Sequence, residues 1–204
     1  DHEEVADLLF EKILEVFNNK GINNIRAVAS EVWGNTLDFV KKWNFKEKEP
    51  SFYSYGLELK DAQDFEVDDS FEIVDFDYEK DLDQMIKIFL DEYGYTEELA
   101  RSNFDLIKNS EGVYAHLLVK ENDVIKGRAL AYVTDNPKIA TNAYIYGESK
   151  FQRALQKEIF KKSKEREVEK MQMFFNPQSE DRIQTYEEFG FKLECKAILF
   201  EKDI

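Results

Sequence analysis

The stretches KKWNFKE at residues 41–47 and EEFGFKLE at residues 187–194 end alike, and this likeness determines how the whole chain is interpreted. Phe45 and Phe191 lie 191 − 45 = 146 positions apart. When residues 1–59 are moved by this offset without gaps, the apolar pattern agrees over roughly 45 positions, and a repeat of this length indicates duplicated domains. The matched pairs include Leu9 with Leu155, Ile13 with Ile159, Ile25 with Met171, Ala27 with Met173, Val28 with Phe174, Trp43 with Phe189 and Asn44 with Gly190.

Each copy predicts the same order of elements: an amphipathic helix, a strand, a short helix, and two further strands. In the first copy Val5, Leu9 and Ile13 lie on one helix face, and Gly21 is placed to end that helix. Asn44 and Gly190 suit the left-handed conformation at the end of each short helix. The expected short helices and strands are 25–29, 36–42, 45 onward and 52–59 in the first copy, and 171–175, 181–189, 191 onward and 197–201 in the second.

The second copy also has an upstream part. A strand is expected at 71–76, a helix that begins with the capping-box-like pair Asp81 and Gln84, a helix at 96–108, and strands at 113–120, 127–134 and 142–146. Its order is therefore β-α-α-β-β-β-α-β-α-β-β. Since 71 − 146 = −75, we expect some 75 residues of the first copy to be absent before Asp1. Residues 61–70 are polar and acidic and predict a linker between the copies.

Composition narrows the classes of function. The net charge of −15 argues against a nucleic-acid partner, because phosphate binding requires clustered positive charge. No apolar run approaches the roughly 20 residues that span a membrane. One cysteine, Cys195, suits the reducing cytoplasm, and the distant His2 and His116 offer no zinc site. We therefore expect a cytoplasmic protein without a metal, a membrane or a nucleic acid among its partners.

The element order and the segment Tyr186–Phe191 (YEEFGF) resemble the GCN5-related N-acetyltransferase (GNAT) superfamily, whose last helix closes with Tyr-x-x-x-Gly-Phe. The resemblance implies a mixed α/β (α+β) fold, with a central, mostly antiparallel sheet flanked by helices. It further implies a complete domain at 71–204, and the C-terminal half of a degenerate first domain at 1–60. Acetyl-CoA would lie in an opening between the strands at 142–146 and 171–175, with its pyrophosphate at the next helix N-terminus. The implied cofactor-binding residues are Gly147, Glu148, Ser149, Lys150, Phe151, Gln152 and Arg153.

The resemblance implies that Tyr186 is the general acid, because a phenol is protonated at neutral pH and can give its proton to the departing thiolate. A core tyrosine without a chemical role is the alternative. The first copy has Val40 at this position, and its loop, Asp1–Ala6, matches the family pattern at Ala6. The second loop has Gly147, Lys150 and Gln152 where the family has Gln or Arg, Gly, and Gly or Ala. Three residues are open as the general base, namely Glu148, Glu111 and His116.

The leading prediction is an N-acetyltransferase that moves an acetyl group from acetyl-CoA to an amine on a small molecule or a protein. An acidic surface favours a cationic acceptor. Two alternatives remain open: a GNAT-like binding or scaffold protein without catalysis, and an acyl or aminoacyl transferase that uses another donor. The oligomeric state is open as well. A homodimer is possible, because an exposed half-domain would expose apolar surface that could pair with another chain.

Overall fold

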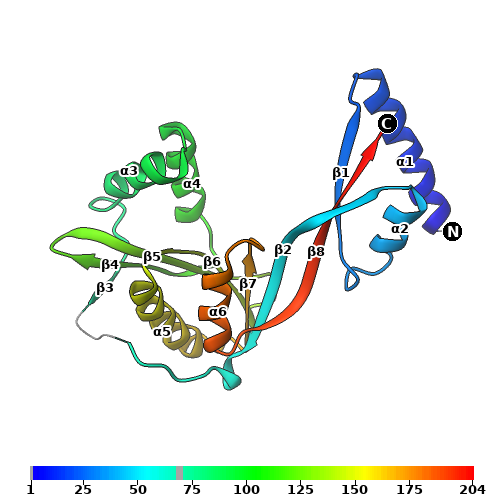
Figure 1. The fold of residues 1–204 in the computed structure, drawn as a ribbon. Coiled ribbons are helices and arrows are strands. Elements are labelled where there is room, and N and C mark those ends of the chain that lie inside the picture. The colour runs from blue at the N-terminus through cyan, green and yellow to red at the C-terminus, as the bar shows by residue number, and fades with distance from the viewer. Residues whose placement is uncertain (1, 68–70) are drawn as a thin grey trace. The chain divides into compact units, whose positions relative to one another are not determined.

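The structure is a computed structural model that describes residues 2–67 and 71–204, with side chains for 4–67, 71–142 and 146–204 (Figure 1). Positions 68–70 of the predicted linker lie outside the described residues. The chain forms two compact units. The first unit contains residues 1–54, 175–178 and 193–204, and the second contains 55–174 and 179–192. These units do not coincide with the two copies of the repeat, and the division into domains at residues 60 and 70 stays a prediction.

The first unit is a three-stranded sheet with two helices. Its elements are α1 (His2–Asn19), β1 (Asn24–Ala29), α2 (Thr36–Lys42), most of β2 (Lys46–Glu58) and most of β8 (Lys192–Asp203). The strand order is β1-β8-β2, and β1 runs antiparallel to β8 with Ala29 opposite Ile198. Ala29, Val40 and Phe200 are its buried core, and the Phe10 ring lies edge-on to Trp43 at 4.7 Å.

The second unit is a larger layered domain. From the end of β2 it continues through a 3-10 turn (Leu59–Asp61), β3 (Glu72–Asp75), α3 (Leu82–Tyr93), α4 (Glu97–Lys108), β4 (Val113–Glu121), β5 (Val124–Val133), β6 (Ile139–Gly147), α5 (Ser149–Glu165), β7 (Lys170–Phe175) and α6 (Glu180–Glu188). The strand order is β2-β7-β6-β5-β4-β3. Helices α3 and α4 lie on one side of β3–β6 and α5 lies on the other (Figure 1). The predicted mixed α/β fold with a mostly antiparallel central sheet is therefore confirmed.

Helical periodicity explains how α5 is anchored. Phe151, Leu155 and Ile159 recur every four residues, and all are buried, because this face of α5 packs on β4, β5 and β6. Burying each such side chain contributes about 1.5–3 kcal/mol. This anchored helix holds its N-terminus at the end of β6, where the candidate site lies.

The repeat is visible in the backbone. Strand β1 at 24–29 becomes 170–175 after a shift of 146, and these are the bounds of β7. Helix α2 corresponds in the same way to α6, and α1 to α5. Asn44 (φ 55°) and Gly190 (φ 100°) both adopt the left-handed conformation that was predicted for them.

Two predicted strand pairs are wrong. Residues 46–58 and 192–203 each form one long strand, β2 and β8, instead of two shorter strands. Each of these strands takes a neighbour from the other copy: β8 pairs with β1, and the end of β2 neighbours β7. Local sequence cannot distinguish the two arrangements, because the alternation of a strand is the same whichever segment it pairs with.

The capping box predicted at α3 is also wrong. The Asp81 carboxylate accepts hydrogen bonds from the Asp77 amide (3.0 Å) and from Lys120 Nζ (2.6 Å), and it does not cap the helix. Gln84 reaches instead to the Ile125 amide at 2.5 Å. Both side chains therefore tie the start of α3 to the β4–β5 hairpin.

The apolar face of α1 differs from that of its counterpart α5. Val5 and Leu9 are 53% and 61% exposed, whereas the equivalent Phe151 and Leu155 are buried. Within residues 2–67 and 71–204, the first unit has no strands that correspond to β4–β6, so nothing described covers this face. In the described part of the chain, no helix has the length and apolar character required to cross a membrane.

Candidate active site at the end of β6

Strands β6 and β7 begin together and then separate. They run parallel, with Ile139 opposite Lys170 and Thr141 opposite Gln172. Beyond this point the two strands make no further ladder pairs in the described part of the chain, although β6 continues to Gly147 and β7 to Phe175. The separated ends lie where the sequence predicts the opening between 142–146 and 171–175.

A cavity of about 540 Å³ lies at the end of β6. It is lined by the ends of α3 and β6, by the starts of β5 and α5, and by α6. The lining residues are Tyr93, Ile125, Lys126, Tyr146, Gly147, Glu148, Phe151, Gln152 and Arg182. Gly147, Glu148, Phe151 and Gln152 were predicted as cofactor-binding residues, and the structure brings them together here.

The N-terminus of α5 opens beside this cavity. The Glu148 carbonyl accepts hydrogen bonds from the amides of Phe151 (2.9 Å) and Gln152 (3.0 Å), and no described side chain caps the helix. The Gln152 side chain donates to the Gly147 carbonyl at 2.6 Å. The first turn contains no acidic residue, so its free amides and the positive end of the helix dipole suit an anion.

The other three predicted residues have different surroundings. Ser149, Lys150 and Arg153 are not among the described lining residues. The Lys150 ammonium lies over the Phe151 ring at 4.5 Å, and 3.9 Å from Glu148. Arg153 forms an ion pair with Glu188 of α6 at 2.8 Å.

Two cations that sequence reasoning missed line the cavity instead, Lys126 and Arg182. Lys126 precedes Gly127, which pairs with Gly147 in the β5–β6 register, and this register carries Lys126 to the loop. Arg182 comes from the start of α6. Neither position follows from a local motif, because both depend on which strands and helices become neighbours.

The ends of α3 and β6 contribute two tyrosines to the lining, Tyr93 and Tyr146. Tyr146 donates a hydrogen bond from its hydroxyl to Glu92 at 2.7 Å, and its ring centroid lies 6.3 Å from that of Tyr93. Burial raises the pKa of Tyr146, and the Glu92 carboxylate raises it further. Tyr146 therefore remains a protonated donor at neutral pH.

Comparison with known proteins finds matches to this chain by structure but not by sequence. No protein-family model matches the chain, and no curated protein matches its sequence. A tandem GNAT protein from the clavulanic acid biosynthesis pathway superposes with a TM-score of 0.72 at 11% identity, over 97% of this chain and 69% of that one. This chain has the GNAT fold.

Two further GNAT structures are similar. A GCN5-related N-acetyltransferase from Sphaerobacter thermophilus has a TM-score of 0.65 at 15% identity, over 88% of this chain and 59% of that one. An acetyltransferase of the GNAT family from Colwellia psychrerythraea has a TM-score of 0.65 at 11% identity, over 86% and 64%. The chain thus spans about three fifths to two thirds of the length of these proteins.

Packing between β5 and β6 explains why residue 147 is a glycine. Gly147 has a φ of 112°, and a Cβ added there would lie 2.5 Å from the Lys126 carbonyl oxygen. Close contact between β6 and β5 therefore requires this glycine, independently of any phosphate. Its part in cofactor binding stays a prediction.

Tyr186 lies in the core of the second unit. Its side chain is fully buried, and its ring packs edge-on against Phe189 at 5.2 Å and Phe191 at 5.5 Å. Burial raises the pKa of Tyr186, so the phenol stays protonated at neutral pH. Tyr186 is not among the described residues that line the cavity, and its role as a proton donor stays a prediction.

The three candidate bases have different surroundings. Glu148 lines the cavity, whereas Glu111 is exposed just before β4. His116 Nε2 accepts a hydrogen bond from Arg128 Nε at 2.9 Å, and the imidazole stacks on Phe76 at 4.1 Å. Burial and the Arg128 charge lower the pKa of His116 to about 2, so it is neutral. Among the described side chains, no three His, Cys, Asp or Glu residues gather into a group that could hold a metal ion.

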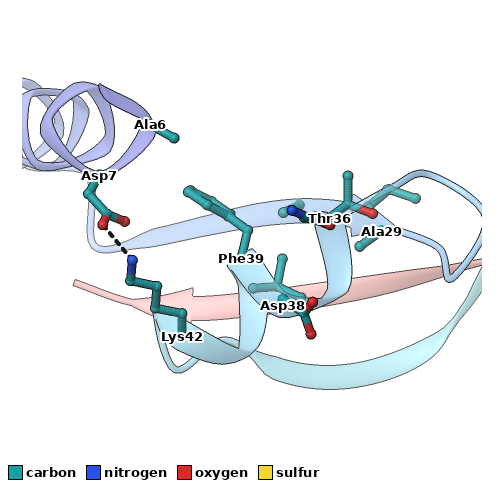
Figure 2. Close-up of a pocket in the computed structure, with 11 residues that line it drawn as sticks. Ala6, Asp7, Ala29, Thr36, Asp38, Phe39 and Lys42 are labelled. Carbon is teal, nitrogen blue, oxygen red and sulfur yellow. Dashed lines mark hydrogen bonds and ion pairs between the residues drawn. The ribbon is translucent and has the colours of Figure 1, made fainter. Parts of the chain in front are cut away.

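A second cavity, of about 570 Å³, lies in the first unit between α1, β1 and α2 (Figure 2). Ala6, the residue of the first loop that fits the family pattern, lines it, and so does Val40, the counterpart of Tyr186. Asp1 of that loop lies outside the described residues. The lining residues are Ala6, Asp7, Ala27, Val28, Ala29, Asn35, Thr36, Asp38, Phe39, Val40 and Lys42.

Proposed function

We propose that the chain is an acyltransferase that moves an acetyl group from acetyl-CoA to an amine. The observation that carries this proposal is the cavity at the end of β6, beside the opening between β6 and β7. There the predicted loop residues Gly147, Glu148 and Gln152 meet two cations. The GNAT fold of the chain supports the same reaction, because solved structures of this fold include N-acetyltransferases.

The residues present suit the phosphate end of such a donor. The described lining contains two cations, Lys126 and Arg182, and one carboxylate, that of Glu148. The uncapped amides at the N-terminus of α5 add hydrogen-bond donors. In the proposed reaction the substrate amine attacks the thioester carbonyl, the carbon–sulfur bond breaks, the nitrogen gives up a proton to a base or to water, and the thiolate takes a proton. Tyr186 is the proposed source of that proton, since its phenol is protonated.

Calorimetric titration with acetyl-CoA tests the donor. We expect micromolar binding, and we expect Lys126→Glu or Arg182→Glu to weaken it at least tenfold, because each change places a carboxylate against the phosphates. Lys164→Glu is the matched control, since Lys164 is an exposed lysine at the far end of α5. Binding that responds equally to Lys126→Glu and Lys164→Glu would contradict the proposed site.

A binding protein without catalysis is the second candidate. Two observations favour it: strand packing already accounts for Gly147, and Tyr186 is buried and does not line the described cavity. Release of free thiol from acetyl-CoA, measured with a panel of small amines and a cationic peptide, separates the two. Tight binding without thiol release would favour the binding protein, and weak binding of acetyl-CoA would favour another acyl or aminoacyl donor.

The acceptor class follows from charge. The chain carries a net charge of −15, so a cationic amine approaches with favourable electrostatics, whether on a small molecule or on a protein. Amine acceptors are therefore proposed in preference to hydroxyl or anionic ones. Rates of acetyl transfer that do not fall with rising salt concentration would count against this steering.

A further inference from the structure

The cavity of the first unit has a residue-level origin. Its lining includes Ala27, Val28 and Ala29 of β1, together with Ala6 of α1 and Val40 of α2. At a shift of 146 the second copy has larger side chains at all of these positions. The pairs are Ala6 with Gln152, Ala27 with Met173, Val28 with Phe174, Ala29 with Phe175, and Val40 with Tyr186. The first copy therefore has a cavity lined by residues whose counterparts in the second copy are larger.

The cavity is largely apolar, and two of its three charged lining residues are acidic. Asp7 and Lys42 form an ion pair at 2.5 Å at one side (Figure 2). The Lys42 hydrogen bond lowers the pKa of Asp7, so this carboxylate is ionised at neutral pH. Asp38 of α2 is a second lining carboxylate, and it is exposed. Among the described lining residues there are thus two carboxylates and one ammonium, in a chain of net charge −15.

This charge distinguishes the two cavities. In the second unit, equivalent positions bring Gln152 and Arg182 to the lining, whereas the first unit has Ala6 and Thr36 there. The Thr36 hydroxyl is engaged, since it donates to the Ser30 carbonyl at 3.0 Å. The first-unit cavity therefore lacks the cation that the cavity at the end of β6 has at this position, and its Lys42 is paired with Asp7. An anionic ligand is disfavoured there.

We propose that the first-unit cavity binds an aliphatic ammonium compound, with its hydrocarbon part against the alanine residues of the lining and its positive charge toward Asp38. Burial of the ligand's hydrocarbon part contributes roughly 25 cal/mol for each Å² of apolar surface removed from water. The Asp38 carboxylate favours a cationic head group over a neutral or anionic one. This site is separate from the proposed acetyl-CoA site, and it does not depend on acetyl transfer.

Trp43 provides a built-in reporter. Its indole Nε1 donates a hydrogen bond to Asp7 at 3.2 Å, beside the cavity. The chain has two tryptophans, Trp33 and Trp43, and a Trp33→Phe background leaves the emission of Trp43 by itself. Hexylammonium, hexan-1-ol and hexanoate are matched probes, because they share one chain length and differ in charge. Calorimetry gives an independent readout.

We expect hexylammonium to change the Trp43 emission saturably, with a dissociation constant on the order of 0.1–1 mM. Hexan-1-ol and hexanoate should bind at least about tenfold more weakly, because neither forms a charge pair with the carboxylate. Asp38→Asn should remove most of the preference for hexylammonium over hexan-1-ol. Equal binding of hexan-1-ol and hexylammonium to the unsubstituted chain would overturn the proposed ligand class.

Filling the cavity is the decisive variant. Ala27→Met with Ala29→Phe introduces the side chains that the second copy carries at the same positions, and it should weaken hexylammonium at least tenfold. Val32→Met is the control, since Val32 is exposed and outside the lining. Far-ultraviolet circular dichroism checks that each variant is folded. Absence of a saturable response, or binding that a folded filled variant retains, would overturn the proposal.

Discussion

Lys42 donates a hydrogen bond to Asp7 at 2.5 Å, and one repeat later the same two positions hold an ion pair of opposite order. Asp7 corresponds to Arg153 and Lys42 to Glu188, and this second pair is 2.8 Å apart. In both copies the pair joins the long helix to the short one. The link between these helices is thus kept while its two charges are exchanged.

This exchange predicts that the second pair tolerates reversal. Arg153→Glu or Glu188→Arg places two like charges together and should each lower the free energy of unfolding by about 0.5–1 kcal/mol. The double variant restores an ion pair in the order of the first copy and should recover most of that loss. Urea unfolding of the four proteins measures the coupling, and a double variant no more stable than the sum of the single changes would contradict the link.

The two equivalent leucines should differ in their contribution to stability. Leu155→Ala removes a buried side chain from the α5 face and should lower the free energy of unfolding by about 2–5 kcal/mol. Leu9→Ala changes a side chain that is 61% exposed, so its effect should stay within about 0.5 kcal/mol. Urea unfolding of this chain compares them directly, and equal losses would mean that the α1 face is covered in solution.

Stability should fall in mild acid because of His116. Its pKa is about 2 in the folded protein and near 6.5 when unfolded, so the unfolded chain binds the extra proton between these values. The stabilisation is complete above pH 6.5 and is lost as pH falls, by about 1.4 kcal/mol at pH 5.5. Urea unfolding at pH 7.5, 6.5 and 5.5 measures this loss. His116→Gln should flatten the dependence over this range, and an unchanged slope would exclude His116 as its source.

Gly147→Ala should destabilise the second unit. The added Cβ would lie 2.5 Å from the Lys126 carbonyl, and the φ of 112° is strained for any L residue. We expect a loss of about 2–3 kcal/mol in unfolding free energy, whether or not acetyl-CoA is present. Gly112→Ala tests a glycine with ordinary φ against a similarly close carbonyl, that of Val133 at 2.9 Å. A Gly147→Ala protein of normal stability would mean that β6 shifts readily.

Tyr186→Phe should separate chemistry from binding. If Tyr186 supplies the proton, turnover should fall roughly 10²-fold or more, with little change in the affinity for acetyl-CoA. The ring stays in its packed position against Phe189 and Phe191, so thermal unfolding serves as the control. Unchanged turnover would leave Tyr186 as a core residue and remove it from the mechanism.

The candidate site could be predicted in part. Gly147, Glu148, Phe151 and Gln152 were found because strand, loop and helix follow one another in the chain, so a local pattern places them together. Lys126 and Arg182 were missed because they reach the cavity through the β5–β6 register and the placement of α6. Lys150 and Arg153 were predicted with the same loop, yet Lys150 lies over an aromatic ring and Arg153 is paired with an acid.

The amino-acid sequence by itself determined the repeat, the order of helices and strands up to the last helix of each copy, and the left-handed ends at Asn44 and Gly190, because these depend on periodicity and backbone preference over a few neighbouring residues. Tertiary structure alone decided the partners of β2 and β8, the exposure of the α1 face, and the residues that surround each cavity. These features depend on contacts between segments far apart in the chain. A strand's alternating pattern specifies which face is apolar, but it does not specify which strand will supply the hydrogen bonds.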